Sequence, residues 1–268
     1  MLFNAKGGTI LIDNTETEYI SFGGGNRNLV LIAGLGEGLR SIKGLALPMA
    51  YLYRIFAKEF KVYIFSRKNV MPQGYSTEDM ADDLKKSMDI FGINKADIVG
   101  VSQGGMIAQH FAADYPDYVN KLVLAVTCGK ANDCVKKSVA PWIEMAKKGR
   151  YQELMADNFK MMYTDNYLKK YRFMMPFVTR IGAPKSYDRF IVMADACLTH
   201  DSMHKLHKIT APTLIIGGKL DKVVDGNASY VLNDRINNSI LRMYEEYGHS
   251  AYDEAADFNK TIYDFLIN

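Results

Sequence analysis

The segment DIVGVSQGG, residues 97–105, decides how this chain is expected to fold. Its first five residues form a short, mostly apolar run that predicts a strand buried on both faces, and the residues after it continue with helical spacing. Gly100, Ser102 and Gly104 match the G-x-S-x-G pattern, in which a serine lies on a sharp strand-to-helix turn. Small neighbours relieve crowding at such a turn, and the helix N-terminus favours developing negative charge. The segment therefore predicts Ser102 as a nucleophile rather than an inert serine in a glycine-rich turn.

Outward from this segment, apolar runs alternate with amphipathic stretches. A hairpin is expected at the start, from Thr9–Ile12 and Glu18–Phe22. Further strands are expected at Leu29–Ile32, Val62–Phe65, Leu122–Val126, Thr213–Gly217 and Ile240–Tyr244. The clearest helix between them begins at Ser76, has Asp79 as a capping-box partner, and stops at Gly92. Strands that alternate with helices predict an α/β fold with a mostly parallel central sheet flanked by helices.

One long segment, residues 129–208, breaks this alternation. It carries helical patterns without a convincing strand, and it contains Trp142, the only tryptophan. We therefore predict that residues 1–128 and 209–268 form an α/β core and that residues 129–208 form a helical cap inserted between two strands. The cap is rich in methionine, which fits an adaptable apolar lid, with ordinary core packing as the alternative. The candidate lid residues are Met145, Met155, Met161, Met162, Met174 and Met175.

A serine nucleophile needs a base, and the chain has five histidines. His249 follows the strand expected at residues 240–244, so it lies at the carboxyl end of a strand, where α/β sheets place their sites. His110 lies two turns into the helix after Ser102, where a packing role is expected. The other three lie near lysines and predict a solvated face rather than a metal site. These three are His200, His204 and His207.

The base needs an acid to orient it and to stabilise its protonated form. Asp221 follows the strand expected at residues 213–217, and it too lies at a carboxyl end. Asp225 is the alternative, but it is better placed to cap the helix that follows. The resulting chain order, Ser102, Asp221 and His249, is the order expected for hydrolases that carry the G-x-S-x-G turn.

An acyl-transfer enzyme must also hold an oxyanion. The predicted donors are the backbone N–H of Gln103, directly after the nucleophile, and that of Leu35, in the glycine-rich segment 34–38 after an early strand. This segment lacks the G-K-[ST] ending of a phosphate loop and the spaced third glycine of a dinucleotide site. The sequence therefore predicts neither a metal nor an organic cofactor.

Several stretches carry a resemblance to a known superfamily: residues 75–84, 100–108, 115–116, 121–124 and 209–214, with Gly248 and His249. They resemble the α/β-hydrolase superfamily, most closely its capped lipase/esterase-like and aromatic-pathway hydrolases. The resemblance covers nearly the whole chain outside the cap, and it implies the α/β-hydrolase fold and the site roles given above. Two departures concern the pocket. Ala33 replaces a common histidine, and residues 65–69 replace an acidic, glycine-rich loop, so the resemblance does not fix a substrate.

These features predict a serine hydrolase that cleaves a small to medium carboxylic ester, or a thioester or lactone, through an acyl-enzyme on Ser102. The same residues fit two alternatives within the fold, a carbon–carbon bond hydrolase and a cofactor-free perhydrolase. A ligand-binding sensor with slow turnover is a further alternative. A purely structural protein is disfavoured because all the triad positions are filled.

Composition narrows the partners and the location. The 268 residues are 48% hydrophobic and 24% charged, with a net charge of +3 and no basic tract, which disfavours a nucleic-acid partner. No apolar run reaches the roughly 20 residues of a membrane span, and residues 1–13 lack a signal-peptide pattern. The three cysteines match no disulfide or metal pattern. We therefore expect a cytoplasmic protein that binds a small-molecule acyl substrate, with its oligomeric state open.

Overall fold

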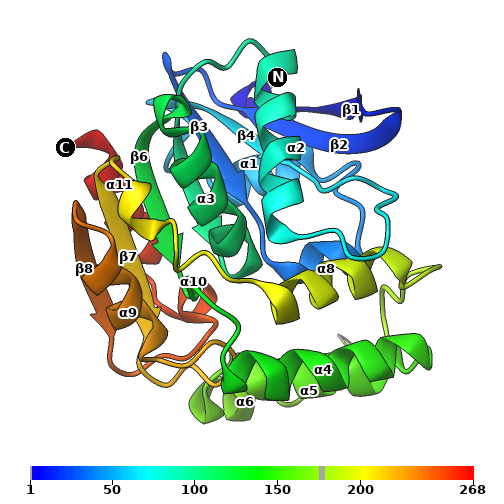
Figure 1. Ribbon diagram of the computed structural model, residues 1–268. Coiled ribbons are helices and arrows are strands. Elements are labelled where there is room, and N and C mark those ends of the chain that lie inside the picture. The colour runs from blue at the N-terminus through cyan, green and yellow to red at the C-terminus, as the bar shows by residue number, and fades with distance from the viewer. Residues whose placement is uncertain (1, 175–178) are drawn as a thin grey trace.

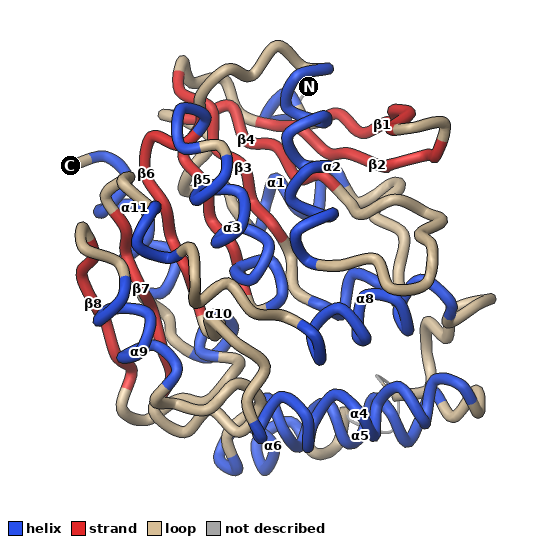
Figure 2. Tube along the Cα trace, viewed as in Figure 1, coloured by secondary structure: helices blue, strands red, loops and turns tan. Residues whose placement is uncertain are grey.

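The computed structural model describes residues 2–174 and 179–268 and is built on one eight-stranded sheet (Figure 1 and Figure 2). The strands are β1 (Lys6–Ile12), β2 (Thr15–Phe22), β3 (Arg27–Ile32), β4 (Phe60–Phe65), β5 (Ala96–Val101), β6 (Val119–Ala125), β7 (Thr213–Gly218) and β8 (Ser239–Tyr244). Their order across the sheet is β1-β2-β4-β3-β5-β6-β7-β8. From β4 to β8 all neighbours pair in parallel, and β1 and β2 form an antiparallel hairpin at one edge. The predicted mostly parallel sheet is confirmed.

Helices connect the strands and flank the sheet. In the described part of the chain they are α1 (Ala46–Leu52), α2 (Thr77–Ile90), α3 (Gln103–Asp114), α4 (Asp133–Lys147), α5 (Tyr151–Met162), α6 (Asp165–Tyr171), α8 (Asp188–Thr199), α9 (Ala228–Arg235), α10 (Ala251–Glu254) and α11 (Phe258–Ile267), with the 3-10 turns η1 (Leu2–Asn4), η2 (Leu35–Leu39), η3 (Pro116–Tyr118) and η4 (Leu206–Lys208). The predicted capping box before α2 is confirmed, because Ser76 Oγ accepts the Asp79 N–H and the Asp79 carboxylate accepts the Ser76 N–H. Gly92, with φ 65°, turns the chain just after α2.

The sheet has a hydrophobic core on each face, because alternate residues of its strands point in opposite directions. Val30 belongs to one core, which includes Phe111 of α3, and the next residue, Leu31, belongs to the other, which includes Ile262 of α11. Figure 1 shows α2 and α3 in front of the sheet. The hydrophobic cores on the two faces hold the strands in place, so that the loops at the carboxyl ends of the strands meet along one edge of the sheet.

The chain between β6 and β7 contains α4, α5, α6 and α8, and its described residues include no strand. We call this part the helical segment. Trp142, Leu154 and Phe190 are buried in a core of its own, which also includes Met106 of α3. Figure 1 shows α8 between the α4–α5 layer and the body of the sheet. The arrangement fits a cap, and the boundaries at residues 129 and 208 stay a prediction.

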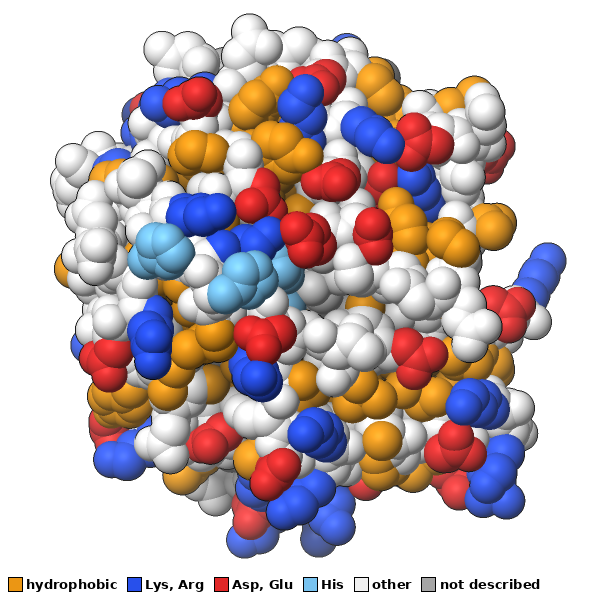
Figure 3. Space-filling view, viewed as in Figure 1, with side chains coloured by type: hydrophobic (Ala, Val, Ile, Leu, Met, Phe, Trp, Pro, Cys, Tyr) orange, Lys and Arg blue, Asp and Glu red, His pale blue; other side chains and the backbone are white. Residues whose placement is uncertain are grey.

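The surface carries charges of both signs. On the face shown in Figure 3, basic and acidic side chains are interspersed rather than gathered into separate regions. Among the residues that the structure describes, no helix has the length and apolar character needed to cross a membrane. The absence of a nucleic-acid partner stays a prediction.

His200 departs from its predicted place on a solvated face, whereas His204 and His207 are exposed. The His200 side chain is buried because the chain leaving α8 packs over α2 and over the loop after β6. Its Nδ1 lies 2.9 Å from Thr77 Oγ1 and its Nε2 lies 3.2 Å from the Cys128 carbonyl oxygen. A neutral ring protonated on Nε2 satisfies both contacts, since Nε2–H donates to Cys128 and Nδ1 accepts the Thr77 hydroxyl.

The buried His200 ring predicts a loss of stability in mild acid. Burial, and then the neighbouring His110, lowers the pKa of His200 from 6.5 to about 3. As the pH falls through 6.5, the unfolded chain therefore binds a proton at this histidine, whereas the folded chain does not. The contribution of His200 to stability is therefore full above pH 6.5 and falls between pH 6.5 and pH 3. Between pH 7 and pH 5, the unfolding free energy of the wild type should fall by about 2 kcal/mol more than that of His200→Gln. Urea denaturation at the two pH values measures this difference, and equal losses in both proteins would contradict it.

Candidate active site

Ser102 lies on a strained turn between β5 and α3. Its backbone has φ 56° and ψ −119°, a left-handed conformation that costs a non-glycine residue about 1–3 kcal/mol. Its neighbours have to be small: a Cβ on Gly100 would lie 2.4 Å from the Gly104 carbonyl oxygen, and one on Gly104 would lie 2.0 Å from the Ile32 carbonyl oxygen. The Ser102 N–H donates to the Ala125 carbonyl at 2.9 Å. The turn is therefore held against β3 and β6 with the serine side chain at the edge of the sheet.

Ser102, His249 and Asp221 lie at the carboxyl ends of β5, β8 and β7, and the structure brings their side chains together. His249 Nε2 lies 2.9 Å from Ser102 Oγ, and His249 Nδ1 lies 2.8 Å from Asp221 Oδ2. His249 and Asp221 are buried, at 2% and 7% exposure, whereas Ser102 is half-buried. The three side chains form a continuous hydrogen-bonded chain from an accessible hydroxyl to a buried carboxylate, which is the arrangement that Ser–His–Asp catalysis requires.

The two candidate acids have different partners. Asp221 Oδ1 accepts the backbone N–H groups of Val223 and Val224 at 2.8 and 2.9 Å, which leaves Oδ2 directed at His249. Asp225 instead accepts an N–H two residues ahead, at 3.0 Å, just before α9. The geometry therefore favours Asp221 as the partner of the histidine.

The two proposed oxyanion donors are the first residues of helical turns beside the serine. Leu35 begins η2 and Gln103 begins α3. The first N–H groups of a helix have no acceptor within it and carry partial positive charge, so both can bind a developing oxyanion. Gly34 permits the close approach, because a Cβ there would lie only 3.3 Å from Ser102 Cβ. Leu35 and Gln103 stay proposed donors.

A cavity of about 550 Å³ opens onto Ser102 and His249. Its size is that of a pocket for a small molecule. The wall is mainly apolar, and the helical segment supplies part of it, including Trp142, Leu154 and Phe159. Besides the histidine, the charged side chains in the described wall are Glu37, Arg40 and Asp253.

The six candidate lid methionines divide into groups. Met155 and Met162 line the cavity, Met145 and Met161 pack beside the core of the helical segment, Met174 is exposed, and Met175 lies outside the described residues. Met155 and Met162 of α5 are therefore the two of this set that are placed to contact a substrate.

Elsewhere in the described residues, Glu78, His110 and Asp114 bring potential metal ligands together. The Lys205 ammonium lies 2.7 Å from a carboxylate oxygen of each acid, so a cation of the chain already pairs with both of them. None of the four lines the cavity at Ser102. We therefore assign this cluster a structural role.

The family model of the alpha/beta hydrolase fold matches residues 29–256, which include Ser102, Asp221 and His249. The chain belongs to this family. A solved alpha/beta hydrolase from a Medee basin deep-sea metagenome library superimposes on this hydrolase with a TM-score of 0.84 and 22% identity, covering 97% of this chain and 98% of that one. This likeness concerns the fold.

Two curated relatives bear on the chemistry of this alpha/beta hydrolase. It is 28% identical to 2-hydroxy-6-oxononadienedioate/2-hydroxy-6-oxononatrienedioate hydrolase 2 of Pseudomonas putida, over 94% of this chain and 91% of the relative. It is also 28% identical to a poly(3-hydroxyalkanoate) depolymerase of Ectopseudomonas oleovorans, over 65% of this chain and 62% of the relative.

Sequence reasoning did not single out Glu37 and Arg189, whose side chains meet beside η2. They are 152 residues apart, and no local motif joins them. The one signal was the unusual segment at residues 65–69, which contains Arg67, a second partner of Glu37. A single sequence does not show that an arginine at the start of α8 pairs with a glutamate so far away along the chain.

Proposed function

We propose that this hydrolase cleaves a carbon–carbon bond next to a ketone, through a covalent intermediate on Ser102. The observation that carries the proposal is the hydrogen-bonded chain from Ser102 through His249 to Asp221, which supplies nucleophile, base and orienting acid. The choice of bond is supported by the Pseudomonas putida relative, whose substrate name contains a hydroxyl, a ketone and two carboxylates but no ester. Hydrolysis of such a compound has to break a carbon–carbon bond.

The geometry supports each step of this reaction. Ser102 Oγ attacks the ketone carbon while His249 Nε2 accepts the hydroxyl proton. The N–H groups of Leu35 and Gln103 hold the resulting oxyanion. The substrate reacts as its 2-oxo tautomer, in which the enol proton has moved to the carbon next to the ketone. Collapse of the intermediate then breaks the carbon–carbon bond, its electron pair is delocalised toward the 2-oxo group as a dienolate, and His249 returns the proton to that fragment. Water, deprotonated by His249, then attacks the acyl-serine and releases a carboxylic acid.

The charges of the cavity favour a substrate in which the group attached to the ketone is uncharged. Arg40 is the one lysine or arginine in the described wall, and its Nη2 donates to the Tyr151 hydroxyl at 3.5 Å. Asp253 lines another part of the wall and accepts the Tyr163 hydroxyl at 2.7 Å. A dicarboxylate would leave one charge without a cation and near this acid, which is unfavourable. We therefore propose a hydroxy-oxo-dienoate with an apolar group on the ketone and one carboxylate, placed at Arg40.

Ester hydrolysis is the second candidate, and the apolar wall favours it as well. A neutral ester needs no cation in the cavity, and the same Ser102 intermediate forms when an alkoxide leaves instead of carbon. The Ectopseudomonas oleovorans relative, whose named substrate is a polyester, supports this candidate over 65% of the chain.

Comparing the two substrate classes tests the proposal. We expect 2-hydroxy-6-oxo-dienoates with a 6-alkyl or 6-phenyl group to lose their conjugated absorbance, with kcat/KM at least about tenfold above that of the 6-carboxyethyl analogue. A set of p-nitrophenyl esters, from acetate to octanoate, measures the competing reaction. Turnover of esters alone would replace the first candidate with the second. Turnover of neither class by folded protein would reject both.

A further inference from the structure

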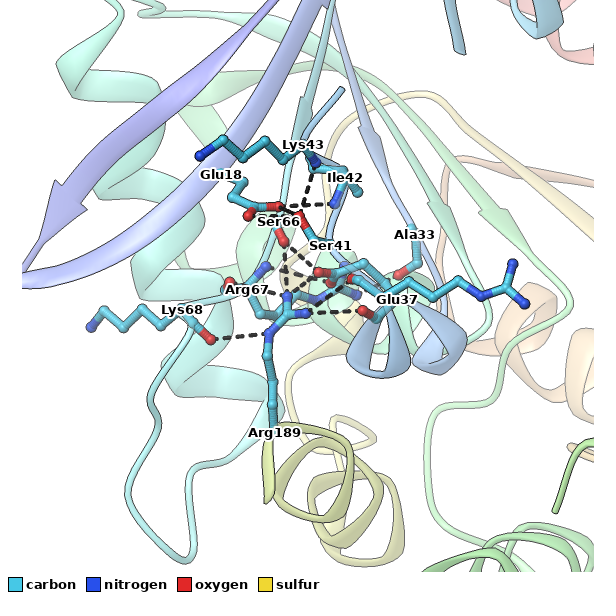
Figure 4. A network of polar contacts seen from close by, with 11 residues as sticks. Glu18, Ala33, Glu37, Ser41, Ile42, Lys43, Ser66, Arg67, Lys68 and Arg189 are labelled. Atoms are coloured by element: carbon cyan, nitrogen blue, oxygen red, sulfur yellow. Dashed lines mark hydrogen bonds and ion pairs between the residues drawn. The ribbon is translucent and has the colours of Figure 1, made fainter. Parts of the chain in front are cut away.

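Arg189 connects the helical segment to the turn that carries Leu35. It lies in the first turn of α8, and its guanidinium donates to the Glu37 carboxylate and, at 2.9 Å, to the Glu37 carbonyl (Figure 4). Further bonds reach the Ser66 hydroxyl at 2.8 Å and the carbonyls of Arg67 and Lys68 at 3.1 and 3.2 Å. All three guanidinium nitrogens of Arg189 thus donate hydrogen bonds, in a planar geometry that a lysine ammonium cannot reproduce.

Glu37 receives this contact inside a closed polar group. Its side chain is 4% exposed, and that of Arg67 is also 4% exposed. Arg67 Nη1 lies 3.0 Å from Glu37 Oε2, and the Ser66 hydroxyl donates to Glu37 Oε1. Removing one member of such a buried pair leaves an uncompensated charge, so the geometry of the group is strongly held.

The same contacts fix the backbone on both sides of Leu35. Before it, Arg67 Nη2 donates to the Ala33 carbonyl. After it, the Glu37 N–H donates to the Gly34 carbonyl at 3.2 Å. That carbonyl belongs to the peptide whose N–H is the proposed oxyanion donor of Leu35, and a bond accepted at the carbonyl polarises the N–H as a donor.

The helix α8 also contacts the residue of the second donor. The Gln103 side-chain amide donates to the Met193 carbonyl and lies 3.0 Å from Cys197 Sγ, and both partners are on α8. Gly38 of η2 packs against the same helix, since a Cβ there would lie 2.9 Å from Phe190 Cα. One helix of the helical segment therefore contacts both turns that supply the oxyanion donors.

We propose that Arg189 is a positioning residue for the oxyanion hole, acting through Glu37 to fix the peptide that presents the Leu35 N–H. The inference rests on the serine hydrolase chemistry proposed above, but not on which bond is cleaved. Arg189 itself has no contact with the substrate in this role. A shift of the helical segment at α8 alters the reactivity of Ser102 through this contact.

Replacing Arg189 by methionine tests the proposal. We expect kcat to fall by about 10- to 100-fold with KM within about threefold, since a displaced oxyanion donor costs part of the 10²–10³ lost when one is removed. Affinity for a boronic acid, which forms a tetrahedral anion on the serine, should fall by a similar factor. Arg189→Lys should recover only a part of both losses. Should the methionine variant not fold, Arg189→Gln is measured in its place.

A matched control separates positioning from stability. Arg27→Met removes another ion pair, with Asp97 at 2.8 Å, at the start of β3 and away from the site, and should lower stability without changing kcat. An Arg189 variant with unchanged kcat and boronate affinity, or with a raised KM alone, overturns the inference. A wild type that neither turns over substrate nor reacts with a fluorophosphonate removes the proposed function, and the inference with it. A reactive wild type with unchanged variants removes the inference alone.

Discussion

Replacing Ser102 by alanine is expected to lower kcat by about a million-fold and to abolish covalent labelling by a fluorophosphonate. The alanine keeps the tight turn but leaves His249 without a hydroxyl to deprotonate, so the acyl-enzyme cannot form. What remains is catalysis by binding and by the oxyanion donors, which in serine hydrolases amounts to about 10³–10⁴ over water. Steady-state kinetics on the best substrate and intact-protein mass spectrometry after labelling measure the two effects.

Ser87→Ala is a suitable control for this experiment. Ser87 is buried, its hydroxyl donates to the Asp83 carbonyl within α2, and it does not line the active-site cavity. Its removal should leave kcat and labelling unchanged. Labelling that persists in Ser102→Ala would place the nucleophile on another residue.

The sequence allowed the three residues of the site to be predicted because each follows a recognisable strand. The carboxyl ends of parallel strands meet at one edge of a sheet, so Ser102, Asp221 and His249 were expected to lie near one another before any coordinate was known. In the structure, the two ring nitrogens of His249 lie 2.9 Å from Ser102 Oγ and 2.8 Å from Asp221 Oδ2. Their catalytic roles stay a prediction.

Contacts between distant segments could not be predicted in this way. His200 lies near lysines in the sequence, a pattern that predicts a solvated face. Its ring is nevertheless buried, because its partners, Thr77 and Cys128, come from other elements. Glu37 and Arg189 meet for the same kind of reason. Which helix end packs over which loop depends on the three-dimensional arrangement of the layers, and local periodicity carries no information on it.

The sequence motif predicts the residues of the site but not the type of bond that is cleaved. Ester hydrolysis was the main prediction from the sequence, and the relatives favour the carbon–carbon alternative. Both reactions use the same nucleophile, base and oxyanion donors, so the motif cannot separate them. The difference lies in whether the cavity stabilises a carbon leaving group and its carboxylate, which makes Arg40 and the apolar wall the features to test.

The second large effect is expected at Asp221, where the asparagine variant should lower kcat by about 10⁴-fold with an intact fold. Asp221 Oδ1 accepts two backbone N–H groups, so an asparagine keeps its oxygen there and turns its NH₂ toward His249. His249 Nδ1 then has to accept rather than donate, which places the ring proton on Nε2. That nitrogen faces Ser102 Oγ at 2.9 Å and can no longer act as a base.

Asp225→Asn is the matched comparison for Asp221→Asn. Asp225 is four residues away and its carboxylate bonds only the turn before α9, at Asn227, so its amide variant should change kcat by less than about threefold. Steady-state kinetics and the rate of fluorophosphonate labelling are measured for both variants, with urea denaturation to confirm that each is folded. A loss of kcat below tenfold in Asp221→Asn, or a larger loss in Asp225→Asn, would show that Asp221 is not the orienting acid. A loss at Asp221 alone means that the buried carboxylate acts by setting which nitrogen of His249 carries the proton.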